Sequence, residues 1–164
     1  VVVARALLQH DMDASPIFPR YEVPLTGRSR FACDTALADA LAAAARSCMA
    51  RACELLGTHR TGFAIDTPRV HEGLVVSGDR FVSSAAESSA LAAALPDALA
   101  VEMEGAAAAQ VCSEFDRPLA VVRTISDRAD DSAHVDFGRF IAEVASVYTR
   151  VIVEQWLQAV APAP

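Results

Sequence analysis

The sequence predicts an α/β fold in three layers, with helices on both sides of a mixed, largely parallel central sheet. Short apolar runs typical of buried strands alternate along the chain with longer alanine-rich helical stretches, which is the order that parallel strands with crossover helices produce. The chain has 164 residues, of which 53% are hydrophobic, and this is enough for one domain with a real core. We therefore expect a single domain over residues 1–164.

The first half of the chain begins with a strand pattern. Residues 1–8 are mostly apolar and predict a buried strand. Residues 35–56 are dominated by alanine and leucine and predict one long helix, closed by Gly57. A short strand is expected at 62–65 and a longer, buried one at 70–77.

The second half repeats the alternation. Ser83 or Ser84 is a candidate N-cap for a helix that ends near residue 95. The elements predicted after it are a strand at 99–101, a helix at 105–115, a strand at 119–126 and an amphipathic helix at 137–157.

The chain opens directly on Val1-Val2-Val3-Ala4, with no initiator Met, cap or leader before this strand pattern. A buried strand rarely begins a domain so abruptly. We expect the sequence to be a piece that begins inside a fold, and its sheet to be incomplete on the N-terminal side.

Composition and charge argue against several function classes. The formal charge of −7 and the scatter of the 14 basic residues argue against nucleic acid as a partner. The longest apolar runs are too short for a membrane span and there is no signal peptide, so we expect no membrane association. Four cysteines without a CxxC pair are interpreted as buried, reduced thiols of a cytoplasmic protein, with a metal site or redox pair as the alternative.

Two carboxylates stand where a predicted strand gives way to a helix. Glu102 and Glu104 are two residues apart, so on an extended backbone they point the same way, with Met103 on the other face. Gly105 follows and lets backbone or ligand come close. Open α/β sheets bind ligands at such strand ends, which makes both carboxylates candidate binding groups. The alternative is an ordinary strand-to-helix junction with Glu104 as a capping acid.

Two further strand ends carry candidate ligand groups. Phe81 lies just beyond one of them, where a flat ring can stack on a planar ligand; the alternative is a ring that plugs the top of the core. Asp127 ends the last predicted strand, with the hydroxyl of Ser126 beside it. Because the ends of consecutive parallel strands lie on one edge of a sheet, we expect Phe81, Glu104 and Asp127 to converge.

Acidic clusters raise the question of a metal. The segment after Asp127 contains Asp130, Asp131, His134 and Asp136. Carboxylates supply oxygen ligands, but the regular spacing of a calcium loop is absent, so we expect a solvated acidic loop. The second cluster, residues 10–13 (His10-Asp11-Met12-Asp13), has the wrong spacing for a closed metal site, and a polar turn is the preferred interpretation. We expect no metal and no cofactor.

Three segments carry a specific pattern in a fixed order. They are Gly73-Leu74-Val75-Val76-Ser77-Gly78-Asp79-Arg80-Phe81, Val101-Glu102-Met103-Glu104-Gly105-Ala106 and Val122-Arg123-Thr124-Ile125-Ser126-Asp127-Arg128-Ala129-Asp130. Together they resemble the signature segments of 5′-methylthioadenosine/S-adenosylhomocysteine nucleosidases, which belong to the purine nucleoside phosphorylase superfamily. The similarity covers nearly the whole chain. It implies a phosphorylase-type α/β fold and hydrolysis of the N-glycosidic bond of those two nucleosides, with release of adenine.

The resemblance also implies roles for individual residues at the nucleoside. By this comparison Phe81 stacks on the adenine and the backbone of Val82 reads its edge. Met103 packs against the ribose. Glu104 accepts hydrogen bonds from the 2′ and 3′ hydroxyls.

The remaining matched positions are implied to complete the site. Asp127 donates a proton to N7 of the leaving adenine, and Ser126 helps to place that carboxyl. Phe137 lines the pocket for the alkylthio group. Glu102, grouped with the substrate-binding residues, and Arg123 support the site from behind.

The implied chemistry is consistent with these side chains. Adenine is a poor leaving group until N7 is protonated, so the acid must stay protonated near neutral pH, and apolar neighbours such as Ile125 disfavour the charged form of a carboxyl. As the bond breaks the ribose gains oxocarbenium character. An ionised Glu104 then binds the positive transition state better than the neutral substrate, which is what catalysis requires.

The resemblance implies a homodimer in which the loop of residues 10–24, from His10 to Pro24, reaches over the alkylthio end of the neighbouring site. The sequence also departs from the family pattern. In these enzymes a preceding segment supplies a Glu that activates water and a Gly/Ser-rich loop, and this chain begins after both. Its other glutamates, among them Glu22, Glu54, Glu72 and Glu87, lie in unrelated contexts.

Four alternatives stay open at this point. A phosphorylase would use the same Asp and Glu with phosphate in place of water, although the run from Ser126 to Asp130 resembles the hydrolases more. A futalosine-type nucleosidase is a further relative. A non-catalytic nucleoside-binding or sensor domain would retain Phe81, Met103 and Glu104 without turnover. A metal-dependent hydrolase would use the acidic loop after Asp127.

Overall fold

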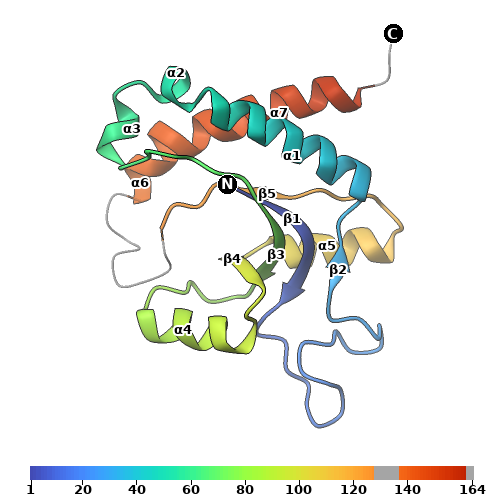
Figure 1. The fold of residues 1–164 in the computed structure, drawn as a ribbon. Helices are drawn as coiled ribbons and strands as arrows, with labels where there is room; N and C mark the ends of the chain where they lie inside the picture. The colour runs from blue at the N-terminus through green and yellow to red at the C-terminus, as the bar shows by residue number, and fades with distance from the viewer. Residues whose placement is uncertain (128–136, 162–164) are drawn as a thin grey trace.

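A computed structural model of the chain describes residues 1–127 and 137–161, and its centre is a five-stranded mixed sheet (Figure 1). The strands are Val2–Gln9 (β1), Phe31–Ala32 (β2), His71–Ser77 (β3), Ala98–Glu102 (β4) and Val122–Arg123 (β5). Strands β1, β3 and β4 lie side by side and parallel, while β2 and β5 both pair with β1 in the antiparallel direction. The predicted mixed, largely parallel sheet is confirmed.

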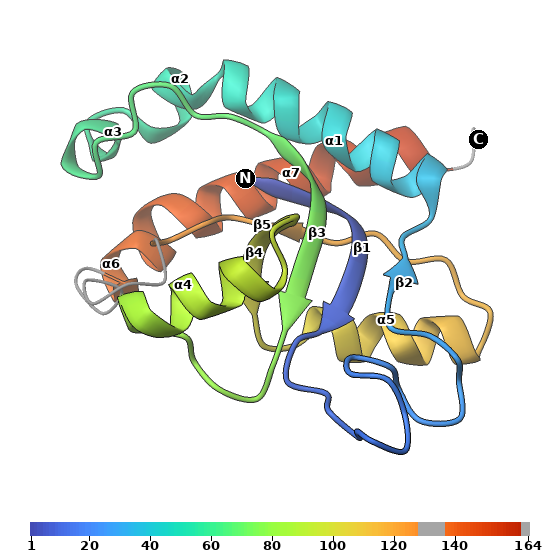
Figure 2. The ribbon, with the colours of Figure 1, turned by 60° about the horizontal axis from the view of Figure 1, so that its bottom comes forward.

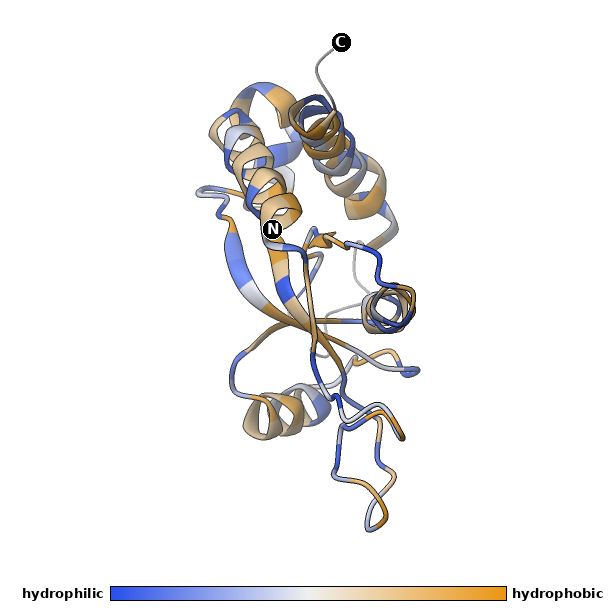
Figure 3. Ribbon diagram, turned by 90° about the vertical axis from the view of Figure 1, so that its right-hand side faces the viewer, coloured by the Kyte–Doolittle hydropathy of each residue, from blue (hydrophilic) through white to orange (hydrophobic). Residues whose placement is uncertain are grey.

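Helices cover both faces of this sheet and complete the three predicted layers (Figures 2 and 3). The four longest are Thr35–Ala50 (α1), Ala85–Ala94 (α4), Gly105–Glu114 (α5) and Ser146–Val160 (α7). Val75 of β3 packs into the larger buried cluster together with residues of α1, α5 and α7. Its neighbours Leu74 and Val76 pack with Leu91 and Leu95 under α4. Alternate residues of β3 therefore build the two halves of the core.

Helix α1 forms where the sequence predicts it, and it is held by an N-terminal cap and by contacts with α7. The Oδ1 of Asp34 caps its N-terminus by accepting the Leu37 N–H at 2.8 Å. Ala42 and Ala45 are fully buried, and such small residues allow close packing against α7. Trp156 of α7 donates its Nε1–H to the carbonyl of Leu37 at 3.1 Å.

The predicted helix at 35–56 is in fact two helices. Residue Arg51, with φ −103° and ψ 13°, ends α1 and separates it from the short helix α2, Ala52–Leu56. Gly57 follows with φ +52°, a conformation that favours glycine, and closes α2 as predicted.

Two strand predictions differ from the structure. The segment at 62–65 is not a strand: the helix α3, His59–Gly62, occupies its start, and Ala64 turns the chain with φ +51°. The strand predicted at 119–126 reduces to β5, which is antiparallel to β1. Its apolar residues still lie along the core, since the Ala4 N–H donates to the carbonyl of Val121 at 2.9 Å.

The closing helix predicted at 137–157 is confirmed, with one feature that periodicity did not predict. It starts as α6, Phe137–Phe140, widens into a π-helical turn over Ile141–Ala145 (η1) and continues as α7. The hydroxyl of Ser146 donates to the carbonyl of Ala142 at 2.6 Å beside this turn. Such single π-turns inside α-helices occur frequently at functional sites.

The four cysteines are free thiols in the structure. Cys33 and Cys48 are buried as predicted, and burial raises the pKa of both thiols above the ordinary value. Cys53 is exposed and Cys112 is half-buried, and both differ from the expectation. Among the helices that the structure describes, none combines the length and the apolar character needed to cross a membrane.

Candidate active site

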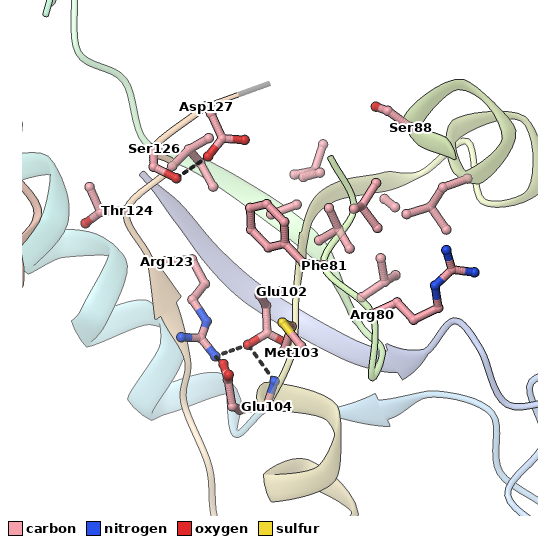
Figure 4. A pocket seen from close by; sticks show the side chains of 18 of the residues that line it. Arg80, Phe81, Ser88, Glu102, Met103, Glu104, Arg123, Thr124, Ser126 and Asp127 are labelled. Atoms are coloured by element: carbon pink, nitrogen blue, oxygen red, sulfur yellow. Dashed lines mark hydrogen bonds and ion pairs between the residues drawn. The ribbon is translucent and has the colours of Figure 1, made fainter. Parts of the chain in front are cut away.

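A cavity of about 570 Å³ opens at the carboxyl ends of β3 and β4 (Figure 4). The structure brings every site residue named from the sequence to its wall, and what each of them does there stays a prediction. These residues are Phe81, Val82, Glu102, Met103, Glu104, Arg123, Ser126, Asp127 and Phe137.

Phe81, Glu104 and Asp127 converge on one cavity as predicted, but the expectation that all three follow parallel strands is wrong for Asp127. Phe81 and Glu104 lie just beyond the ends of the parallel strands β3 and β4, as open α/β sheets arrange their ligand groups. Asp127 does not end a parallel strand, because β5 is antiparallel to β1 and stops at Arg123. The irregular segment 124–127 instead continues from β5 along the cavity wall and places Ser126 and Asp127 there (Figure 4).

Glu102 is the most heavily bonded carboxylate of the site. Its side chain is only 11% exposed, and both oxygens accept the N–H of Gly105, at 2.9 and 3.0 Å. It also accepts a hydrogen bond from the hydroxyl of Ser77 and pairs with the Arg123 guanidinium. The Glu102 carboxylate therefore satisfies an N-terminal N–H of α5 and fixes the strand-to-helix turn.

Ser77 is a contributor that the sequence reasoning missed. It is buried at the end of β3, and its Oγ accepts the N–H of Ala106 at 2.7 Å while donating to Glu102. One hydroxyl thus joins the end of β3, the end of β4 and the start of α5. The available signal was a hydroxyl that closes the apolar run Leu74-Val75-Val76.

Glu104 differs from Glu102 although both approach the same guanidinium. It occupies the N-cap position of α5, yet its side chain makes no capping hydrogen bond, so the interpretation of Glu104 as a capping acid is wrong. Its side chain is 73% exposed, and its Oε2 lies 3.2 Å from Nη2 of Arg123. Partial burial lowers the pKa of the Arg123 guanidinium from its ordinary value, which is far above neutrality, so the cation persists between the two carboxylates.

Large apolar side chains face the same cavity. Phe81 is 45% exposed, which contradicts the alternative of a ring that plugs the core. Met103 was expected on the face opposite Glu102, but it also lines the cavity, because β4 ends at Glu102 and strict alternation ends with it. Phe137 of α6 and Ile141 of the π-helical turn complete this apolar wall. Ile141 was not singled out from the sequence.

The third acidic group of the cavity is Asp127. Ser126 donates its hydroxyl hydrogen to Oδ2 of Asp127, so this hydroxyl orients the carboxyl group (Figure 4). The metal hypothesis for the acidic segment falls on Asp130, Asp131, His134 and Asp136, which lie outside the described residues. Over 1–127 and 137–161, no group of three or more His, Cys, Asp or Glu side chains is placed to hold a metal ion.

The strand ends of this α/β sheet present an aromatic ring, a thioether and carboxylates to one cavity, and α/β proteins of the open-sheet class bind their ligands at such an edge. A family model described as "Phosphorylase superfamily" matches residues 1–155. The chain therefore belongs to the phosphorylase superfamily, which confirms the family resemblance.

Solved structures add detail to this assignment. The chain is 30% identical to a 5′-methylthioadenosine/S-adenosylhomocysteine nucleosidase of Neisseria meningitidis, with a TM-score of 0.78, covering 97% of this chain and 61% of that one. It is 26% identical to an S-adenosylhomocysteine nucleosidase of Streptococcus pyogenes, with a TM-score of 0.75 and coverages of 99% and 60%. It is 28% identical to a futalosine hydrolase of Helicobacter pylori, with a TM-score of 0.75, covering 97% of this chain and 60% of that one. The chain thus spans about three fifths of the length of these relatives.

Proposed function

We propose that the protein hydrolyses the N-glycosidic bond of 5′-alkylthio-adenine nucleosides, namely 5′-methylthioadenosine and S-adenosylhomocysteine, and releases adenine. The observation that carries the proposal is that Asp127 and Glu104 line one cavity, with Phe81 on the same wall. The similarity to solved nucleosidases supports the choice of reaction.

At the adenine end the proposed groups are Phe81, Val82, Asp127 and Ser126. The ring of Phe81 stacks on the purine, and the backbone of Val82 bonds its edge. Asp127 gives its proton to N7, so the pair of electrons of the C1′–N9 bond leaves with a neutral adenine. The Ser126 hydroxyl, already bonded to Oδ2 of Asp127, holds the carboxyl in the orientation for this transfer.

At the ribose end the proposed groups are Glu104, Met103, Arg123 and Glu102. Glu104 accepts hydrogen bonds from the 2′ and 3′ hydroxyls, and its negative charge stabilises the oxocarbenium-like ribosyl as the bond breaks. Met103 packs against the sugar. Glu102 and Arg123 act on substrate through Glu104, since Arg123 pairs with both carboxylates. Water then adds to C1′ and loses a proton; we assign no residue of this chain to its activation.

The alkylthio end and the assembly complete the proposal. Phe137 lines the pocket for the thioether substituent. We propose a homodimer in which the loop of residues 10–24 reaches the neighbouring site, and the 82% exposure of Ile17 in this loop supports a partner for it. We also propose a cytoplasmic location, which the four free thiols support.

A release assay tests the reaction directly. Purified protein is incubated with 5′-methylthioadenosine, with and without inorganic phosphate, and adenine and the sugar product are measured. Adenine with free methylthioribose, independent of phosphate, is the expected result. A requirement for phosphate would identify a phosphorylase instead, and tight binding without turnover would identify a nucleoside-binding or sensor domain.

A second candidate substrate deserves the same assay because one of the similar structures is a futalosine hydrolase. The apolar wall formed by Phe137 and Ile141 is proposed to contribute to discrimination between the two nucleosides at the 5′ end. We expect kcat/KM for methylthioadenosine to exceed that for futalosine. The opposite order would move the assignment to futalosine cleavage.

A further inference from the structure

We propose that Asp11 is a positioning residue for the loop of residues 78–83, which carries Phe81 and Val82 to the adenine end of the cavity. This inference rests on the function proposed above for Phe81. It assigns a task to the cluster at residues 10–13, whose side chains the proposed reaction does not use.

The loops that follow β1 and β3 leave the sheet side by side, at the same edge (Figure 2). The 78–83 loop has neither helical nor strand pairing of its own, so its shape depends on the groups that bond its backbone. Two such bonds hold its first residues. The Gly78 N–H donates to the carbonyl of Glu102 at 3.1 Å, and the Asp79 N–H donates to Oδ2 of Asp11 at 2.7 Å.

The contact between the two loops is close as well as hydrogen-bonded. The His10 N–H donates to the carbonyl of Ser77 at 2.8 Å, which extends the pairing of β1 with β3 by one residue. A Cβ added at Gly78 would lie 2.4 Å from Nε2 of His10 and 3.0 Å from Oδ2 of Asp11. Glycine at this position therefore serves the close approach of the loops.

The bond from Asp79 to Asp11 is the kind that fixes a loop. The acceptor is a carboxylate, and charge-assisted hydrogen bonds are roughly twice as strong as neutral ones. Asp79 is two residues before Phe81, so a shift of its peptide moves the ring that is proposed to stack on adenine. Loss of the Asp11 carboxylate is expected to weaken adenine binding more than it slows bond cleavage by Asp127.

The neighbouring Asp13 supplies a matched control. It lies in the same loop, but its Oδ1 accepts hydrogen bonds from the N–H and the hydroxyl of Ser15, at 3.1 and 2.6 Å. Its further contact is an ion pair with Arg20, which belongs to the same loop. Substitution at Asp13 removes the same charge from the same loop without touching residues 78–83.

The experiment compares Asp11→Ala, Asp11→Asn and Asp13→Ala by steady-state kinetics on methylthioadenosine and by calorimetric adenine binding. We expect Asp11→Ala to raise KM and the adenine Kd about tenfold, the equivalent of one charged hydrogen bond, with kcat within about twofold. Asp11→Asn keeps an acceptor oxygen and is expected to restore most of the loss. Asp13→Ala is expected to leave the adenine Kd at the wild-type value, because its contacts do not reach residues 78–83. An unchanged Kd in Asp11→Ala, or an equal loss in Asp13→Ala, overturns the proposal.

A double-mutant cycle with Phe81→Ala separates positioning from general stability. If Asp11 acts through this loop, Asp11→Ala costs less adenine affinity in the Phe81→Ala background than in the wild type, with only the part that acts through Val82 remaining, whereas fully additive losses overturn the proposal. Hydrogen exchange at the Asp79 amide gives a readout that needs no substrate: it is expected to be faster in Asp11→Ala than in the wild type, and equal rates overturn the inference. Wild-type protein that neither binds nor cleaves the nucleoside overturns the proposed function, while this exchange measurement still decides the loop contact.

Discussion

Glu102 and Glu104 are the same chemical group two residues apart, and both approach the guanidinium of Arg123, yet their surroundings differ completely. The Glu102 side chain is largely buried and accepts hydrogen bonds from Gly105 and Ser77. The Glu104 side chain is largely exposed towards the cavity and has an ion pair with Arg123. A buried carboxylate whose oxygens are occupied stabilises the fold, whereas an exposed one at a cavity wall is available for a ligand.

Residue type and spacing therefore identify the residues of a site, but they do not show which of these residues is open to a ligand and which one supports its neighbours. Both glutamates belong to the matched segment, and the sequence reasoning placed Glu102 with the substrate-binding residues. The structure gives Glu102 contacts that explain a supporting role: it caps α5 and orients Arg123, which in turn contacts Glu104. The comparison predicts that substitutions at the two positions separate stability from activity.

The largest effect is expected at the third carboxylate of the cavity, which sets the scale for the other two. Asp127→Asn removes the proposed proton donor but keeps the shape of the side chain. We expect kcat to fall by about 10²–10⁴-fold, while nucleoside binding survives. Adenine-release kinetics and calorimetric binding of methylthioadenosine measure the two effects, and unimpaired turnover would remove Asp127 from the mechanism.

Glu104→Gln tests the exposed member of the pair. The amide keeps hydrogen-bonding capacity but loses the charge that is proposed to stabilise the oxocarbenium-like ribosyl, so kcat/KM is expected to fall by about 10–100-fold. Thermal unfolding is expected to be unchanged, because the Glu104 side chain is largely exposed. A marked drop in Tm for this variant would show that Glu104 is structural and would erase the contrast with Glu102.

Glu102→Gln tests the buried member. The amide nitrogen would face the N–H of Gly105 or the guanidinium of Arg123, which places a donor against a donor. We expect the free energy of unfolding to fall by about 1–3 kcal/mol, as measured by denaturant titration. We expect a smaller loss of kcat/KM than in Glu104→Gln, because Glu102 acts on the cavity only through Arg123 and Glu104. A variant as stable as the wild type would contradict the assigned cap.

Ser77→Ala is expected to give the smallest effect. It tests the structural role of Glu102 from the side of its hydrogen-bond donor. It removes one neutral hydroxyl that accepts from Ala106 and donates to Glu102. The expected loss of stability is about 0.5–2 kcal/mol, the range for a lost helix cap. Ser77→Thr, which keeps the hydroxyl, is the control; equal losses in both variants would indicate a packing effect.

Local signals explain which parts of the fold the sequence predicts well. The helix at α4 begins after Ser84, whose Oγ accepts the Glu87 N–H, and both partners lie within one turn of sequence. The strands β3 and β4 follow from apolar runs of the expected length. The break at Arg51 and the π-helical turn lie within otherwise helical sequence patterns, so periodicity alone does not reveal them.

Pairing between distant segments explains what the sequence does not predict. The apolar run at 119–126 reads as a parallel strand, but its pairing is decided by β1, more than a hundred residues earlier. The Ser77 contact to Ala106 joins residues 29 apart in sequence, and the Asp11 contact to Asp79 joins residues 68 apart. The members of the cavity wall could be named from the resemblance, whereas the bonds that hold them required the folded chain.

The π-helical turn at Ile141–Ala145 has a consequence for how this chain tolerates insertions and deletions. Phe137 before the turn and Ile141 at its start line the cavity, whereas Tyr148 and Ile152 after the turn are buried in the core. The wide turn absorbs one extra residue, so deleting a single residue there would restore ordinary α-helical winding and leave the two segments facing their present surroundings. A single deletion elsewhere in this helix would instead rotate one segment against the other by about 100°.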